Sequence, residues 1–128
     1  MMDELSLRKT LASLPLGGLR YFEQTGSTND IARSWAADGA PDLALVWAEE
    51  QTSGRGRGDR RWFTPPGKAL AFSLIVRPLP GEEQSVSLFS GLGAMAVCEA
   101  LLMRGLHPEI KWPNDVLLKR RKVCGVLA

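Results

Sequence analysis

The feature that most limits the possible folds of this 128-residue chain is the segment of residues 51–68, QTSGRGRGDRRWFTPPGK. Glycine weakens the interior of helices and strands, and proline lacks the backbone donor that both need. An apolar stretch, residues 43–50, precedes the segment, and residues 69–77 alternate large apolar with small or polar side chains after it. We therefore expect a long loop between two neighbouring strands of one sheet. Loops this long are uncommon in compact domains unless they are functional.

The charge on this loop indicates an anionic ligand. Residues 54–61 hold four arginines against one aspartate, and residues 111–122 hold five lysines and arginines against one aspartate. The rest of the chain is net negative, because the total charge is only +2. Positive charge gathered in two places favours a localised phosphate or carboxylate site over a generally basic surface. A solvated flexible linker is the alternative for the loop taken alone.

The composition, with 45% hydrophobic and 23% charged residues, predicts one soluble globular domain. Two cysteines, Cys98 and Cys124, are too few for a disulfide framework or a zinc site, and Cys98 is expected to be a small buried hydrophobe. The N-terminus is acidic at Asp3 and lacks the pattern of a signal peptide. The longest apolar run, residues 88–103, is too short and too polar for a membrane span by sequence. These observations predict a cytoplasmic protein.

Apolar spacing and turn residues predict the order of the elements. Helices are expected over residues 3–14 and 84–104 and from Ser27 to Gly39, and strands over residues 19–24, 43–50, 69–77, 109–112, 116–119 and 123–127. Ser27 and Asp30 resemble a capping box at the start of the second helix. The long helix is expected to share one apolar face, formed by Phe89, Leu92, Ala96, Ala100 and Leu101.

The residue types exclude several kinds of catalytic centre. His107 is the only histidine, and no Ser–His–Asp, Cys–His or metal-ligand cluster can be assembled from the motifs. Chemistry must then come from cationic side chains, backbone amides and a few polar groups. These groups suit the activation of a carboxylate by a nucleotide, in which two anions are held together without proton transfer. A closing loop would shield the labile acyl-adenylate from water.

Four motifs, in order along the chain, resemble the biotin protein ligase family. They are Ser27-Thr28-Asn29, Gln51-x-x-Gly54-Arg55-Gly56-Arg57, Lys111-Trp112-Pro113-Asn114-Asp115, and Lys122 followed by Gly125. The resemblance covers about residues 20–128 and corresponds to the N-terminal part of the catalytic domain. It implies an α+β fold: a mixed, largely antiparallel sheet flanked by helices, similar to class II aminoacyl-tRNA synthetases. Residues 1–128 are expected to be a partial catalytic domain, with no N-terminal DNA-binding domain and no repressor function.

The resemblance also implies an activity and a set of roles. The family converts biotin and ATP, with Mg²⁺ accompanying the nucleotide, to biotinyl-5′-AMP, and then transfers biotin to a carrier-protein lysine. Biotin would be bound by Ser27, Thr28, Asn29, Gln51, Gly54, Arg55, Arg57 and Lys122. ATP and the adenylate would be bound by Arg57, Trp62, Lys111, Asn114 and Asp115. Arg55, Lys111 and Lys122 would be catalytic, no protein-bound metal is expected, and Trp112 and Pro113 are interpreted as packing and turn residues.

The implied partner is the biotin carboxyl carrier protein of acetyl-CoA carboxylase or a related carboxylase, with no DNA and no membrane. The oligomeric state is left open. One alternative is a lipoate or octanoate ligase of the same superfamily, against which the Gly-Arg-Gly-Arg spacing argues. Another is a basic nucleic-acid-binding module, which would require strongly salt-dependent binding.

Overall fold

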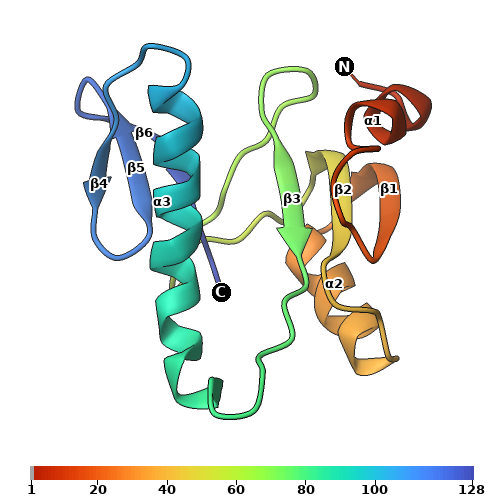
Figure 1. Ribbon diagram of the computed structural model, residues 1–128. Coiled ribbons are helices and arrows are strands. Elements are labelled where there is room, and N and C mark those ends of the chain that lie inside the picture. Colours follow the sequence, from red (N-terminus) through yellow and green to blue (C-terminus); the bar gives the residue numbers. More distant parts are fainter. Residues whose placement is uncertain (1) are drawn as a thin grey trace. The chain divides into compact units, whose positions relative to one another are not determined.

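The structure of the chain, a computed structural model, describes residues 2–128 and separates into two compact units at Arg77 and Pro78 (Figure 1). Each unit has its own three-stranded sheet and its own buried cluster. One of the two sheets is mixed and the other is antiparallel throughout. The predicted fold class, α+β with largely antiparallel strand pairing, is confirmed.

The first unit consists of α1 (Glu4–Thr10), β1 (Gly18–Thr25), α2 (Thr28–Ala37), β2 (Ala44–Gln51) and β3 (Ala71–Leu74). Its strand order is β1-β2-β3, with β1 parallel and β3 antiparallel to β2. The strands on either side of the glycine-arginine loop are therefore neighbours, as predicted. The central strand β2 is buried at six consecutive positions. Such a run requires cover on both faces of the strand, which explains why its sequence does not alternate.

Burial alternates along β3 and the residues that flank it. Ala71, Ser73 and Ile75 are buried, whereas Leu70, Phe72, Leu74 and Val76 are exposed to between 43% and 70%. Helix α2 packs against both β2 and β3, and its Ala32 is in the same buried cluster as Ile75. On the other face the ring of Phe72 stacks on Trp47 at 5.8 Å between centroids. The strand is shorter than the predicted residues 69–77.

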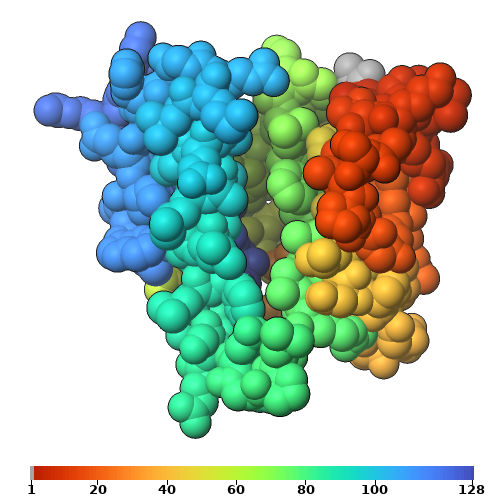
Figure 2. Space-filling view, in the orientation of Figure 1, coloured from red at the N-terminus to blue at the C-terminus, as the bar shows by residue number. Residues whose placement is uncertain are grey.

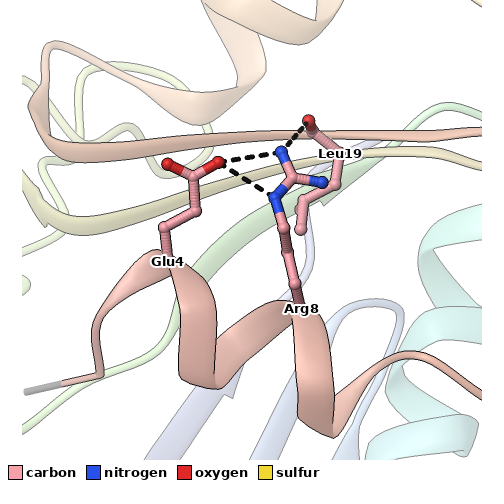
Figure 3. Close-up of polar contacts among 3 residues, drawn as sticks. All are labelled: Glu4, Arg8 and Leu19. Atoms are coloured by element: carbon pink, nitrogen blue, oxygen red, sulfur yellow. Dashed lines mark hydrogen bonds and ion pairs between the residues drawn. The ribbon is translucent and has the colours of Figure 1, made fainter.

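Polar contacts tie α1 to β1. The Asp3 carboxylate accepts a 2.8 Å hydrogen bond from the Ser6 amide, which lowers the pKa of Asp3. Arg8 pairs with Glu4 at 2.8 Å and also donates to the carbonyl of Leu19 at 3.2 Å (Figure 3). The predicted helix over residues 3–14 was too long, because the residues after α1 form turns instead.

The capping box predicted for α2 is wrong. Ser27 is the N-cap residue, but its side chain makes no capping hydrogen bond. The amide of Thr28, which begins the helix, donates to the side chain of Gln51 instead. A partner distant in sequence thus replaces the local cap, and it joins the start of α2 to the end of β2.

The second unit consists of η1 (Glu83–Leu88), α3 (Phe89–Leu102), β4 (Glu109–Lys111), β5 (Asp115–Leu118) and β6 (Arg121–Gly125). The strands form an antiparallel meander, and α3 contacts all three of them. Small residues allow this approach: a Cβ at Gly91 would lie 2.8 Å from the ring of Trp112, and one at Gly93 would lie 2.8 Å from Val126. Cys98 is buried in this interface, as predicted.

The predicted apolar face of α3 was wrong. The buried residues are Gly91, Ala94 and Cys98, whereas Leu92 and Met95 are more than half exposed. Periodicity could not select the face because every side of this helix is apolar. Figure 2 shows the outward side chains of α3 at the surface of the second unit.

The second unit contains a helix long and apolar enough, by length and composition, to cross a membrane. It combines η1 and α3 over Glu83–Leu102, and an 18-residue stretch of it has a mean hydropathy of 1.6 with 11% of that stretch buried. The sequence argument against a span relied on the shorter run of residues 88–103, and the 3₁₀ segment η1 extends that run. A core helix in a soluble protein meets the same length and composition criteria, so the absence of a membrane partner stays a prediction.

Lys119 and Arg120 form the turn between β5 and β6 with φ values of 49° and 65°. A left-handed conformation costs a residue with a side chain about 1–2 kcal/mol, and Asn-Gly is the favoured pair in such a two-residue turn. We therefore expect Lys119→Asn combined with Arg120→Gly to raise the melting temperature by a few degrees in calorimetry. Arg121→Gly, one residue later in β6, should lower it. A double variant no more stable than the parent would contradict the strain at this turn.

Candidate functional site

A buried polar cluster joins the start of α2, the end of β2 and β3. Gln51 Oε1 accepts from the Thr28 amide at 2.8 Å and from Thr28 Oγ1 at 3.1 Å. Thr28 Oγ1 also lies 2.9 Å from Ser73 Oγ, which donates to Asn29 Oδ1 at 2.5 Å. The structure therefore brings together Thr28, Asn29 and Gln51, as expected from their motifs, and Ser27 lies beside them, 3% exposed.

The side chains of this cluster offer both hydrogen-bond donors and acceptors. The Thr28 and Ser73 hydroxyls each carry one hydrogen and can also accept, and they contact each other, Gln51 and Asn29. The Gln51 and Asn29 amides each have a carbonyl oxygen and an NH2 group. The cluster is therefore suited to a ligand that carries polar groups of both kinds.

Two residues of this region were missed by the sequence reasoning. Ser73 bonds to two predicted site residues, and Thr64 Oγ1 accepts from the backbone amide of Gln51 at 2.9 Å. Ser73 is one of the small residues that alternate along β3, and its polarity was the only available signal. Thr64 is 1% exposed and pairs with Gln51 in an isolated bridge, which nothing in the local sequence indicated.

The glycine-arginine loop is an ordered hairpin at its base. The Trp62 amide donates to the Gly54 carbonyl at 2.8 Å, and the Gly56 amide donates to the Arg60 carbonyl at 2.7 Å. Gly58 has a φ of +64° at the tip. Residues 51–68 therefore hold more structure than a solvated linker would.

Gly54 is required by the narrowness of this hairpin. A Cβ there would collide with the carbonyl oxygen of Trp62 and lie 2.9 Å from Gln51 Nε2. The glycine thus lets the two sides of the loop close next to the buried cluster. Trp62 is half-buried, so the indole predicted to lie near an adenylate is partly accessible.

Cationic side chains surround an open concavity on this loop. Its volume is about 290 Å³, and it is lined by Ser53, Gly54, Arg55, Gly58, Asp59, Arg60 and Arg61. Asp59 is the only acid among the lining residues, so the concavity favours anions. Arg57 does not line it, although it lies in the same hairpin. Arg55 Nη2 lies 2.8 Å from Asp30 Oδ2 of α2.

The predicted nucleotide residues are divided between the two units: Lys111, Asn114 and Asp115 lie in or between strands β4 and β5 of the second unit, whereas Arg57 and Trp62 lie in the hairpin of the first unit. Lys122 Nζ lies 3.0 Å from Asp115 Oδ1, and Lys111 is the register partner of Asp115. Asn114 is buried and donates to the Val126 carbonyl at 3.0 Å, so its amide holds the end of the chain against the sheet. We predicted that the two cationic segments, residues 54–61 and 111–122, act on one ligand, and this stays a prediction.

Gly125 makes room for the Lys122–Asp115 pair. A Cβ at Gly125 would lie 3.1 Å from Lys122 Cε and 3.3 Å from its Nζ. The next residue back, Cys124, is half-buried, and this burial raises the pKa of its thiol above the ordinary value, although the positive charge of Lys122 opposes the rise. Cys124 is therefore neutral at physiological pH and is a poor nucleophile.

Two further observations complete the site. Trp112 packs its ring over Gly91 but is 67% exposed, so it is not the core residue that was expected, whereas Pro113 lies in the turn between β4 and β5, as expected. Over residues 2–128, no three His, Cys, Asp or Glu side chains gather where they could hold a metal ion.

The narrow base of the hairpin is testable by proteolysis. Gly54→Ala should disrupt the Trp62–Gly54 hydrogen bond, and a loss of about 1 kcal/mol should open the loop about fivefold more often. Limited trypsin digestion should then cut at the loop arginines about fivefold faster. Gly26→Ala is the matched control, because a Cβ there meets nothing within 4 Å. Equal cleavage rates in the two variants would contradict the close approach at Gly54.

Comparison with known proteins agrees with this arrangement. Residues 21–128 match the model of the biotin/lipoate A/B protein ligase family. The chain is 38% identical over 129 residues to the bifunctional ligase/repressor BirA of Bacillus subtilis, covering 98% of this chain and 39% of that protein. It is 37% identical over 134 residues to the biotin–[acetyl-CoA-carboxylase] ligase of Mycobacterium tuberculosis, covering 99% and 50%.

Solved structures show the same similarity. The biotin protein ligase from Aquifex aeolicus in complex with biotin and ATP aligns with a TM-score of 0.73 and 31% identity, over 86% of this chain and 45% of that one. The ligase from Leishmania major in complex with biotin aligns with a TM-score of 0.69 and 28% identity, over 84% and 49%. The chain thus spans half or less of the length of these relatives.

Proposed function

Because the chain belongs to the biotin/lipoate A/B protein ligase family, we propose that the protein activates biotin with ATP and transfers it to a carrier protein. In the first step a biotin carboxylate oxygen attacks the α-phosphorus of ATP, and pyrophosphate leaves. In the second step a lysine amine attacks the acyl carbon of biotinyl-5′-AMP, loses a proton, and AMP leaves. The acceptor would be the biotin carboxyl carrier protein of a carboxylase such as acetyl-CoA carboxylase, in the cytoplasm.

The observation that carries this proposal is the polar cluster of Thr28, Gln51 and Ser73 at the base of the arginine hairpin. The ureido ring of biotin offers two N–H donors and a carbonyl acceptor, which match the oxygens and N–H groups of such a cluster. The curated relatives reported above are named as biotin ligases or as a ligase/repressor, and both solved relatives hold biotin. A lipoyl or octanoyl chain has no such donors.

The cationic residues have the roles that charge neutralisation requires. Arg55 and Arg57 would oppose the negative charge of the biotin carboxylate and the phosphates. Lys122 would bridge the carboxylate and the α-phosphate, shared with or released from Asp115. Lys111, Asn114 and Asp115 would help to place ATP and its Mg²⁺, and Trp62 would cover the adenylate.

Calorimetry on the complete natural protein that contains residues 1–128 tests the choice of substrate. Biotin should bind, and binding should tighten in the presence of ATP because the adenylate accumulates. Lipoate and octanoate should compete weakly or not at all, since they cannot donate to the buried oxygens. Binding of octanoate or lipoate in preference to biotin would reassign the protein within its family. Salt-dependent DNA binding without biotin binding would refute the ligase proposal.

Lys122→Ala tests the proposed role of the lysine. We expect the rate of adenylate formation, measured by the release of pyrophosphate, to fall by about 10²–10³-fold, the usual effect of removing one transition-state contact. The melting temperature should change little, because the lysine is partly exposed. Arg121→Ala in the same strand is the control and should keep its activity. A large loss of stability with normal turnover would show that Lys122 is structural.

A further inference from the structure

The hairpin arginine with the closest tie to another element is Arg55, and its partner is Asp30. Arg55 Nη2 lies 2.8 Å from Asp30 Oδ2, and the two residues are 25 apart in sequence. Asp30 is in the first turn of α2, two residues after Thr28. The same turn of helix therefore contributes to the buried cluster and holds an arginine of the hairpin.

The backbone of Arg55 is already fixed without this contact. Arg55 pairs with Arg61 in an isolated bridge, and the hydrogen bonds between Gly54 and Trp62 and between Gly56 and Arg60 close the hairpin on both sides of that bridge. What the Asp30 carboxylate adds is the direction of the guanidinium. Without it, a long side chain that is 56% exposed would sample many rotamers.

The contact leaves the guanidinium able to bind a second anion. An arginine side chain has five N–H donors in a planar fork, and the hydrogen bond to Asp30 involves Nη2 alone. The other edge of the fork can donate to a carboxylate or phosphate while Nη2 stays on Asp30. Because both partners are partly exposed, the pair is weak enough to readjust when the ligand binds.

We propose that Asp30 is a positioning residue: its carboxylate holds the Arg55 guanidinium in one orientation beside the start of α2, ready for the anionic group of the substrate. This inference rests on the proposed function, because the substrate anion is the biotin carboxylate or the phosphate of its adenylate. It assigns a role to a residue outside the motifs that carry the family resemblance. If Asp30 instead competed with the ligand for Arg55, its removal would tighten binding.

A double-mutant cycle tests the inference in the complete natural protein that contains residues 1–128. Asp30→Ala should raise the calorimetric Kd for biotin and for biotinyl-5′-AMP by about three- to fivefold, the scale of an exposed ion pair. In an Arg55→Ala background the same substitution should have no further effect, because Asp30 acts only through the arginine. Asp30→Glu should restore part of the affinity. A role in helix stability alone would give the same loss in both backgrounds.

Glu4→Ala is the matched control. Glu4 and Arg8 form another exposed ion pair at 2.8 Å, in α1 (Figure 3), and its loss should leave both dissociation constants unchanged. Unchanged or tighter binding in Asp30→Ala, or equal losses in both backgrounds, would overturn the inference while the wild type still binds biotin. Failure of the wild type to bind biotin would remove the proposed function and the inference together.

Discussion

The arrangement of the first unit depends on one side chain, the amide of Gln51. Its carbonyl oxygen accepts from both the amide and the hydroxyl of Thr28, so it supplies the N-terminal cap that Ser27 does not provide. This single oxygen joins the start of α2 to the last residue of β2, where the arginine hairpin begins. The Gln51 oxygen accepts from two donors of Thr28, so removing the Gln51 side chain would leave buried polar groups of Thr28 without this hydrogen-bond partner. The cluster is thus both a structural joint and the base of the candidate ligand site.

The positively charged side chains of the candidate site are attached to backbone that is held in place by its own strand pairing. Arg55 and Arg61 project from a paired hairpin, and Lys122 projects from β6, which pairs antiparallel with β5 and has a register shift next to this lysine. Two glycines make these arrangements possible. Gly54 allows the Trp62 backbone to approach closely across the hairpin, and Gly125 leaves space for the side chain of Lys122. Charges held in this way need little rearrangement before they meet an anion, which is the condition for strong electrostatic stabilisation of a transition state.

Several features of this structure were readable from the sequence because local chemistry determined them. The burial of β2, the hairpin turn after β5 and the pairing of the strands around the loop all follow from apolar runs and turn residues. Thr28 and Gln51 were found through ordered motifs. The roles assigned to individual residues remain predictions, because contacts alone do not show what each side chain does to a ligand.

The features that sequence reasoning missed depend on contacts between distant residues. The cap of α2 comes from Gln51, so a local capping pattern gave the wrong partner for the helix start. The face of α3 was misassigned because its composition is apolar on every side, and only packing against Trp112 and Val126 selects the glycine-lined face. Ser73 and Thr64 entered the site for the same reason, through partners in other strands and loops.

The outward side of α3 has a consequence for the behaviour of the chain in solution. Leu92, Met95 and Leu102 of α3 are each more than half exposed, and so is Leu88 at the end of the adjoining η1. Apolar surface of this kind promotes self-association and precipitation unless something covers it. The outward side of α3 is therefore one of the surfaces that favour association at high concentration, and a polar substitution at Met95 would reduce its contribution.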